Sequence, residues 1–196
     1  MDKPKIVLFH PRTFHEKNYR YYHVPYSILA VTTALDLDRF DVVLIDDNVY
    51  QKADYLSELK SLESNLLCVG ISSMIGAQIE SGIRFAKEVH NLSRVIPIIW
   101  GGPLPTMLPQ ETASHPCVDI AVRGQGEITF REIVERLESG KSLVEVKGIS
   151  TRREDGKIIH NQDRPFIDLD TFLPYTKVYH LLNLENYIWP DEHIAD

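Results

Sequence analysis

Glycine follows two short apolar runs in the second half of the chain. The first run ends in Ile98-Ile99-Trp100-Gly101-Gly102-Pro103, and the second leads into Arg123-Gly124-Gln125-Gly126-Glu127. Glycine lets the main chain approach a ligand closely or adopt a positive φ. In open α/β sheets, ligands bind outside the carboxyl ends of the strands. The spacing therefore predicts a ligand site built largely from backbone, where two strands end.

A third apolar run ends on small and polar residues, Ser72-Ser73-Met74. A lone Gly-x-Gly is a weak signal, but three successive strand ends of this kind are more specific. The chain has no Gly-x-x-x-x-Gly-Lys-Ser/Thr loop for a nucleotide triphosphate, and no Gly-x-Gly-x-x-Gly follows its first apolar run. The residues favour a ligand that threads between strand ends and presents few charges.

Apolar runs of strand length alternate with helical repeats along the chain. We expect strands over 5–9, 41–45, 66–71, 95–100 and 118–122, and helices over 25–37, 53–62, 77–89 and 127–137. Pro103, Pro105 and Pro109 are expected to prevent a regular helix before about Gln110. The alternation predicts an α/β fold with a doubly wound, five-stranded parallel sheet, flavodoxin-like or Rossmann-like, in the order 2-1-3-4-5.

The switch point of this strand order lies between the first and third strands. The long loop from His10 to His23 and the Ser72-Ser73-Met74 segment are then on opposite sides of one crevice, beside Gly101-Gly102. Asp46-Asp47 could suggest a response-regulator receiver. Receivers also need an acidic pair after the first strand and a lysine after the fifth, and the chain has neither. We interpret Asp46 as a capping or turn residue.

The pattern changes after Gly140. Residues 147–152 and 157–160 flank Asp155-Gly156, a typical turn of a β-hairpin. Beyond Pro165 the chain is rich in aromatic residues but has no run long enough to form a second core. We expect an α/β domain over 1–142, followed over 143–196 by a hairpin and a linker with little of its own to pack on.

Composition limits the classes of partner. The 196 residues are 43% hydrophobic and 25% charged, with a formal net charge of −7, which argues against nucleic acid because phosphate binding needs a basic surface. No apolar run reaches the ~20 residues of a membrane helix, and no secretory signal is seen. Cys68 and Cys117 are expected to be core residues, and the histidines have no metal-ligand spacing. These features predict a cytoplasmic protein without a membrane partner.

The motifs together resemble the cobalamin-binding domain at the front of cobalamin-dependent radical S-adenosylmethionine enzymes. The resemblance rests on Pro25-Tyr26-Ser27-Ile28-Leu29-Ala30, Ile45-Asp46, Val69-Gly70-Ile71-Ser72-Ser73-Met74, Trp100-Gly101-Gly102-Pro103 with Pro109, Val118-Asp119, and residues 122–127 with Phe130. In the tail it rests on Lys147-Gly148-Ile149, Asp168-Leu169-Asp170, Leu173-Pro174 and Leu184-Glu185-Asn186-Tyr187. Each motif is short, but their order and spacing cover nearly the whole chain.

The resemblance implies cobalamin as the cofactor and assigns its binding to residues at the strand ends. These are Ser72, Ser73, Met74, Gly101, Gly102, Pro103, Arg123, Gly124, Gln125, Gly126 and Glu127. Ser72 and Met74 would flank the dimethylbenzimidazole tail, and the glycines would let that tail pass close to the sheet. Residues 123–127 would close the pocket with backbone N–H groups at a helix start. The corrin ring would lie over the strand ends.

One cobalamin signature is missing. Many cobalamin proteins carry Asp-x-His-x-x-Gly after the first strand, and the histidine binds cobalt from below. Residues 10–15, His-Pro-Arg-Thr-Phe-His, do not match it. We therefore expect a base-off cofactor with no protein histidine on cobalt, and His10 is the candidate if a histidine does bind.

The related enzymes cleave S-adenosylmethionine with a 4Fe-4S cluster held by Cys-x-x-x-Cys-x-x-Cys. With only Cys68 and Cys117, this chain cannot hold such a cluster. The resemblance thus implies a binding domain of a methyltransferase or ring-forming enzyme, whose partner is a downstream catalytic barrel of the same polypeptide. The alternative is a non-catalytic flavodoxin-like module that binds a flavin or a partner protein. Residues 10–20 match a flavin-phosphate loop poorly.

Overall fold

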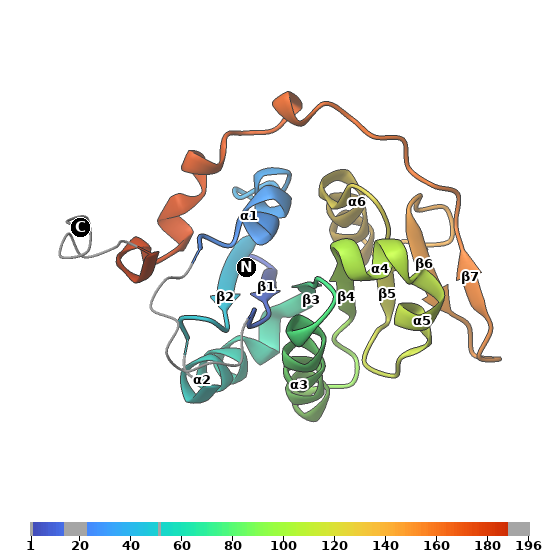
Figure 1. The fold of residues 1–196 in the computed structure, drawn as a ribbon, viewed down its shortest axis with the longest axis horizontal. Helices are drawn as coiled ribbons and strands as arrows, with labels where there is room; N and C mark the ends of the chain where they lie inside the picture. Colours follow the sequence, from blue (N-terminus) through green and yellow to red (C-terminus); the bar gives the residue numbers. More distant parts are fainter. Residues whose placement is uncertain (1, 14–22, 51, 188–196) are drawn as a thin grey trace, which may run out of the picture.

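A seven-stranded sheet forms the centre of the computed structural model, which describes residues 2–13, 23–50 and 52–187. Its order is β2-β1-β3-β4-β5-β6-β7 (Figure 1). The strands are β1 (Lys5–His10), β2 (Asp41–Asp46), β3 (Leu66–Ser72), β4 (Ile98–Gly101), β5 (Ile120–Val122), β6 (Ile149–Arg152) and β7 (Ile158–His160). The first five are parallel, so the predicted α/β class and the order of these five strands are confirmed, but the predicted count of five was wrong because two further strands join the sheet. The predicted hairpin, β6–β7, extends the same sheet through an antiparallel pairing with β5.

The strand β1, second in the sheet between β2 and β3, is apolar at consecutive positions and is covered on both faces. Val7 and Phe9 belong to one core cluster, which also contains Phe85 and Trp100. Their neighbours Ile6 and Leu8 belong to a second cluster on the opposite face. Successive side chains of a strand point to opposite faces, so this single strand contributes to both layers of the core.

Two helices cover each face of the sheet (Figure 1). On one face lie α1 (Tyr26–Thr33) and α6 (Gly126–Glu138), and on the other α2 (Lys52–Leu62) and α3 (Ala77–Leu92). A short turn, η1 (Glu63–Asn65), links α2 to β3. Both cysteines are buried, as expected, and burial raises the pKa of Cys68 to about 12. Among the described residues, no helix is both long and apolar enough to cross a membrane.

Two short helices occupy the proline-rich segment, where we expected no regular helix before Gln110. They are α4 (Pro103–Met107) and α5 (Pro109–Ser114). That expectation was wrong because Pro103 and Pro109 each take the first position of a helix, where the missing N–H costs no hydrogen bond. The fourth strand also begins later than expected, since Val95 is 86% exposed and precedes β4.

The segment that follows the hairpin, residues 161–187, is called the tail. It runs back over α6 and α1 towards β2 (Figure 1). It contains the short turns η2 (Leu169–Thr171), η3 (Tyr175–Lys177), η4 (Tyr179–Leu181) and η5 (Leu184–Tyr187). Val178 is fully buried in the cluster on the α1 side of the sheet, and the Tyr187 hydroxyl donates to Asp46 Oδ2 at 3.0 Å. The expectation that the tail has little to pack on was therefore wrong for this part. Leu173, however, remains 54% exposed.

Candidate functional site

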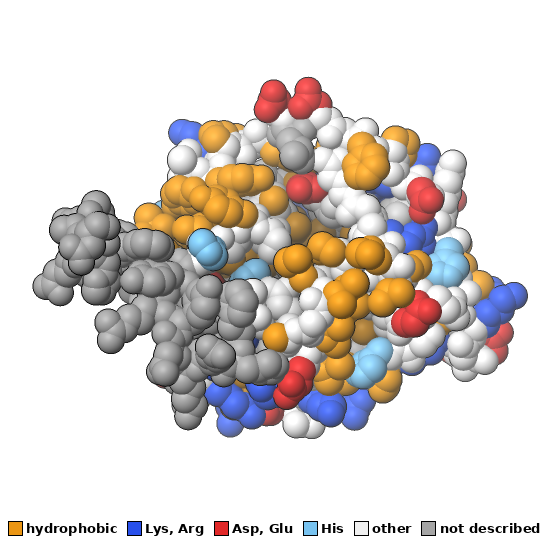
Figure 2. Space-filling model, in the orientation of Figure 1, with side chains coloured by type: hydrophobic (Ala, Val, Ile, Leu, Met, Phe, Trp, Pro, Cys, Tyr) orange, Lys and Arg blue, Asp and Glu red, His pale blue; other side chains and the backbone are white. Residues whose placement is uncertain are grey.

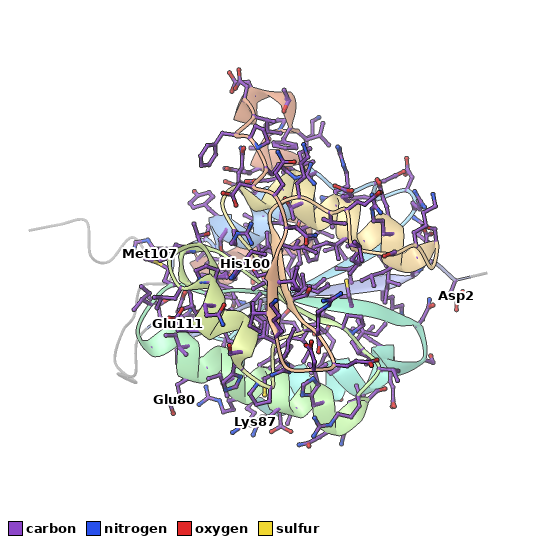
Figure 3. The ribbon with its side chains drawn as sticks, turned by 90° about the vertical axis from the view of Figure 1, so that its right-hand side faces the viewer. Asp2, Glu80, Lys87, Met107, Glu111 and His160 are labelled. Carbon is purple, nitrogen blue, oxygen red and sulfur yellow. The ribbon has the colours of Figure 1, made fainter. Side chains whose placement is uncertain are left out.

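A cavity of about 600 Å³ opens at the carboxyl ends of the parallel strands, between α1 and α6. Met107, which lines it, lies at the opposite side of the molecule from Asp2, which precedes β1 (Figure 3). Eight of the residues assigned to the site from sequence line the cavity, namely Ser72, Gly101, Gly102, Pro103, Gly124, Gln125, Gly126 and Glu127. The volume falls within the ~300–1,000 Å³ of small-molecule sites.

Two of the lining glycines leave the cavity open. A Cβ added to Gly101 or to Gly124 would meet no heavy atom of the described residues within 4 Å. At Gly124 the backbone also has a φ of +71°, a conformation that strongly favours glycine. The walls are otherwise apolar, with Ile28 from α1 and Phe130 from α6 on either side. No bulky side chain of the described residues plugs the space predicted from the three strand ends.

Gly102 serves the packing of the loops that surround the cavity. Its φ is +93°, and an added Cβ would lie 2.9 Å from the Ser73 carbonyl oxygen. That oxygen accepts a hydrogen bond from the N–H of Leu104 at 3.0 Å. Ser73 itself is buried, and its hydroxyl donates to the Met74 carbonyl at 2.9 Å. The Met74 side chain is exposed, and neither Ser73 nor Met74 lines the cavity.

Arg123 is also absent from the lining, because its side chain turns towards the hairpin. Its Nη1 donates to the Ile149 carbonyl and to the Ser150 hydroxyl, at 2.8 and 2.6 Å. Its Nη2 donates to the Asn161 carbonyl and to Asp163 Oδ1, at 2.6 and 2.7 Å. The Arg123 guanidinium therefore fixes the hairpin to the end of β5. Arg123 adjoins Gly124 only through its backbone.

His10, the last residue of β1, is not among the residues that line the cavity. Its Nδ1 is 3.4 Å from the hydroxyl of Ser27, which does line it. Burial lowers the pKa of His10 below its ordinary value, and the Asp46 carboxylate opposes this shift. Most of the loop predicted from His10 to His23 lies outside the described residues.

Asp46 is a buried turn residue, in agreement with its interpretation from sequence. Its Oδ1 accepts hydrogen bonds from the backbone N–H and the side-chain amide of Asn48, at 2.9 and 2.7 Å. Asp47 is buried beside it, and its Oδ2 accepts from the Ser81 hydroxyl at 2.6 Å and from Arg84 at 3.2 Å. Both carboxylates are thus satisfied within the protein.

Glu127 places a carboxylate at the cavity wall. Within the part of the chain that the structure describes, its Oε2 is the buried side-chain oxygen for which no hydrogen-bond partner is found. Buried polar atoms are nearly always paired, so an unpaired one calls for an explanation. A ligand that donates a hydrogen bond inside the cavity would supply the missing partner.

Several lining residues were not identified from sequence. Ser27, Ala30 and Val31 come from α1, Thr106 from α4, and Phe166 from the tail. The α1 residues are spaced so that they share one face of a helix, but nothing in the sequence tells that this face borders a cavity. The described residues contain no group of three or more His, Cys, Asp or Glu that could hold a metal ion.

An open cavity at the carboxyl edge of a doubly wound sheet defines a small-molecule-binding domain. The B12 binding domain family matches residues 17–134. The chain therefore belongs to this family of cobalamin-binding domains. The residues fit such a cofactor, because the cavity is mostly apolar, is left open by its glycines and contains an acceptor, Glu127 Oε2, that has no partner among the described residues.

Similar proteins are longer than this chain. An uncharacterised methyltransferase of Pyrococcus horikoshii is 30% identical over 162 residues, which cover 81% of this chain and 34% of that protein. The anaerobic magnesium-protoporphyrin IX monomethyl ester cyclase of Rubrivivax gelatinosus is 27% identical over 156 residues, with 76% and 27% covered. The chain thus spans about a third or less of the curated relatives it matches.

Two solved structures share the fold. The radical S-adenosylmethionine methyltransferase TsrM of Kitasatospora setae, with cobalamin and a 4Fe-4S cluster bound, superposes with a TM-score of 0.68 at 17% identity. It covers 85% of this chain, which corresponds to 30% of TsrM. The cobalamin-dependent radical enzyme OxsB with aqua-cobalamin bound gives a TM-score of 0.68 at 21% identity, over 84% of this chain and 23% of OxsB.

Proposed function

We propose that this chain holds cobalamin for a radical S-adenosylmethionine methyltransferase or a related ring-forming enzyme, with the nucleotide tail of the cofactor inserted between α1 and α6. The observation that carries the proposal is the open cavity at the strand ends, lined by Gly101 and Gly124. Bound cobalamin supplies the organometallic chemistry of methyl transfer, and the protein supplies position and surroundings.

Different groups around the cavity would contact different parts of the cofactor. Gly101 and Gly124 let the nucleotide tail lie against backbone, while Ile28, Ile99 and Phe130 offer apolar surface to its aromatic base. The first N–H groups of α6 have no partner within the helix, so they can donate to ribose or phosphate oxygens. Glu127 Oε2 can accept from a hydroxyl group of the cofactor.

We further propose that no protein histidine binds cobalt. His10 does not line the cavity, its Nδ1 lies near the Ser27 hydroxyl, and the chain lacks the histidine signature after β1. The electron paramagnetic resonance spectrum of the cobalt(II) form tests this directly. We expect a base-off spectrum without nitrogen superhyperfine splitting. Splitting that disappears in His10→Ala would identify His10 as the ligand instead.

The proposed partner is a catalytic barrel that follows this domain and holds S-adenosylmethionine and the cluster. The matched part makes up 34% of the Pyrococcus horikoshii relative and 27% of the Rubrivivax gelatinosus relative, which supports such a domain. Large apolar side chains are exposed after β3 and at the cavity, namely Met74 and Ile75 after the strand and Met107 in the cavity lining. Figure 2 shows hydrophobic side chains gathered across the middle of this face, around a hollow.

Ligand retention separates this function from the flavin alternative. The purified chain is mixed with hydroxocobalamin or with flavin mononucleotide and desalted, and the visible spectrum is recorded. We expect corrin absorbance close to one equivalent and no retained flavin. Retention of the flavin without the corrin would overturn the proposal, and retention of neither would favour a protein-binding module.

A further inference from the structure

Phe166 is an aromatic residue of the tail that lines the cavity and is 82% exposed. Single exposed apolar side chains are ordinary on protein surfaces. Phe166 differs from them because the short segment around it, residues 163–167, is fixed to the domain on both sides of the ring. We call this segment the strap.

Before Phe166, the strap is tied to α6. Arg164 Nε donates to the Thr129 hydroxyl at 2.8 Å, and Arg164 also forms an ion pair with Glu132. One residue earlier, the Asp163 carboxylate accepts from Arg123 at 2.7 Å. Charged groups thus set the position of the backbone as it reaches the cavity.

After Phe166, the strap is tied to the cavity itself. The side-chain amide of Gln125 makes two hydrogen bonds to the backbone of Ile167, accepting from its N–H at 2.8 Å and donating to its carbonyl at 3.1 Å. Gln125 stands between Gly124 and Gly126 in the cavity wall. These two hydrogen bonds fix the backbone next to Phe166 against the cavity wall.

We propose that the strap places Phe166 at the cavity mouth so that its ring packs against the nucleotide tail of bound cobalamin. The inference rests on the proposed function, since it assigns a further contact within the same site. A fixed aromatic ring offers a flat apolar face to an aromatic base at little entropic cost, and stacking of this kind strengthens binding. Gln125 is then a positioning residue, which acts through Phe166.

Two probes and a matched control test the contact. Dissociation constants are measured by equilibrium dialysis for hydroxocobalamin and for cobinamide, which carries the corrin but lacks the nucleotide tail. Phe166→Ala is compared with Val144→Ala, whose side chain is 78% exposed and does not line the cavity. Thermal unfolding of each variant shows whether the fold is retained.

We expect Phe166→Ala to weaken hydroxocobalamin binding about five- to tenfold, with cobinamide binding unchanged, and Phe166→Leu to lie in between. Val144→Ala should bind both probes as the wild type does. If Gln125 acts through the ring, Gln125→Ala combined with Phe166→Ala should bind no more weakly than Phe166→Ala alone.

Three results would overturn the inference. Unchanged hydroxocobalamin binding by a folded Phe166→Ala variant would show that the ring does not contact the cofactor and would favour another domain as its partner. The proposed function would stand. An equal loss for both probes would place the ring against the corrin or make its role a general structural one. Failure of the wild-type chain to bind hydroxocobalamin would remove the proposed function itself.

Discussion

Glu127 brings a carboxylate oxygen into the wall of the cavity, and this oxygen has no partner among the residues that the structure describes. Leaving a buried acceptor unpaired costs about 1–3 kcal/mol, so we expect the empty protein to tolerate its removal well. In Glu127→Met the free energy of unfolding should not fall, while the dissociation constant for hydroxocobalamin should rise about tenfold if the cofactor donates to this oxygen. Urea unfolding and equilibrium dialysis measure the two quantities. Unchanged affinity would assign Glu127 to the favourable first turn of α6 alone.

Because His10 is partly buried, we expect the free energy of unfolding to depend on pH. The pKa of His10 is lowered by burial, so below its ordinary value of about 6.5 the unfolded chain binds a proton more readily than the folded one. The free energy of unfolding should therefore fall as the pH drops from about 6.5 towards 5. His10→Asn should flatten this fall relative to the wild type, because it removes the group that takes up the proton. Parallel slopes, or an NMR titration with a pKa above 6.5, would contradict the assignment.

For single residues, the sequence predicted features of the backbone better than the directions of side chains. Gly101 and Gly124 were identified because a glycine at a strand end has a local physical reason. Arg123 follows the same pattern, yet its guanidinium serves the hairpin, because its acceptors lie 26 to 40 residues further along the chain. Pairings over such separations leave no periodic signal in the sequence.

Among the elements, the tail is joined to β2 by a partly buried hydrogen bond. The Tyr187 hydroxyl donates to Asp46 Oδ2, and burial raises the pKa of Tyr187, with Asp46 adding to the shift. Tyr187→Phe removes the donor and leaves a buried carboxylate oxygen unpaired, so the free energy of unfolding should fall by about 1–3 kcal/mol. Urea unfolding measures this loss.

A double-mutant cycle with Asp46→Ala shows whether the two side chains act together. Coupling is expected, because each single variant already breaks the same bond. Strictly additive effects would mean that the tail is held elsewhere, for example through the buried Val178.

Helices and strands were predicted well where a repeating pattern of apolar residues defines them. They were predicted poorly where a single residue or a single tertiary contact defines them. Consecutive apolar residues identified the strands, and the Asp155-Gly156 turn identified the hairpin. The two helices begun by Pro103 and Pro109 were missed because proline was read as a barrier rather than as a first helical residue. The path of the tail depends on contacts such as those of Val178 and Tyr187, and no periodic repeat in the sequence shows which residues they meet.

For the whole molecule, topology fixes the place of the site. Parallel strands in the order 2-1-3-4-5 bring their carboxyl ends to one edge, and helices α1 and α6 leave a cavity there. The alternation of strands and helices predicts a parallel sheet, whose carboxyl ends lie at one edge, so the edge was predictable. The shape of the cavity was not, because it depends on side chains from α1, α4 and the tail that no local motif connects.

The central claim is that the nucleotide tail of cobalamin occupies this cavity. Gly101 tests it most directly, since a Cβ there meets no heavy atom of the described residues within 4 Å and its backbone does not have a positive φ. Gly101→Ala and Gly101→Leu should therefore fold as the wild type does, with side chains that progressively fill the space.

The deciding measurement is the dissociation constant for hydroxocobalamin across this series, with thermal unfolding as the check on folding. We predict a modest loss for Gly101→Ala and a loss of about tenfold or more for Gly101→Leu, because overfilling a packed site costs about 1–3 kcal/mol. Wild-type affinity in a folded Gly101→Leu variant would contradict the account, since the cofactor would then bind with its proposed place already taken.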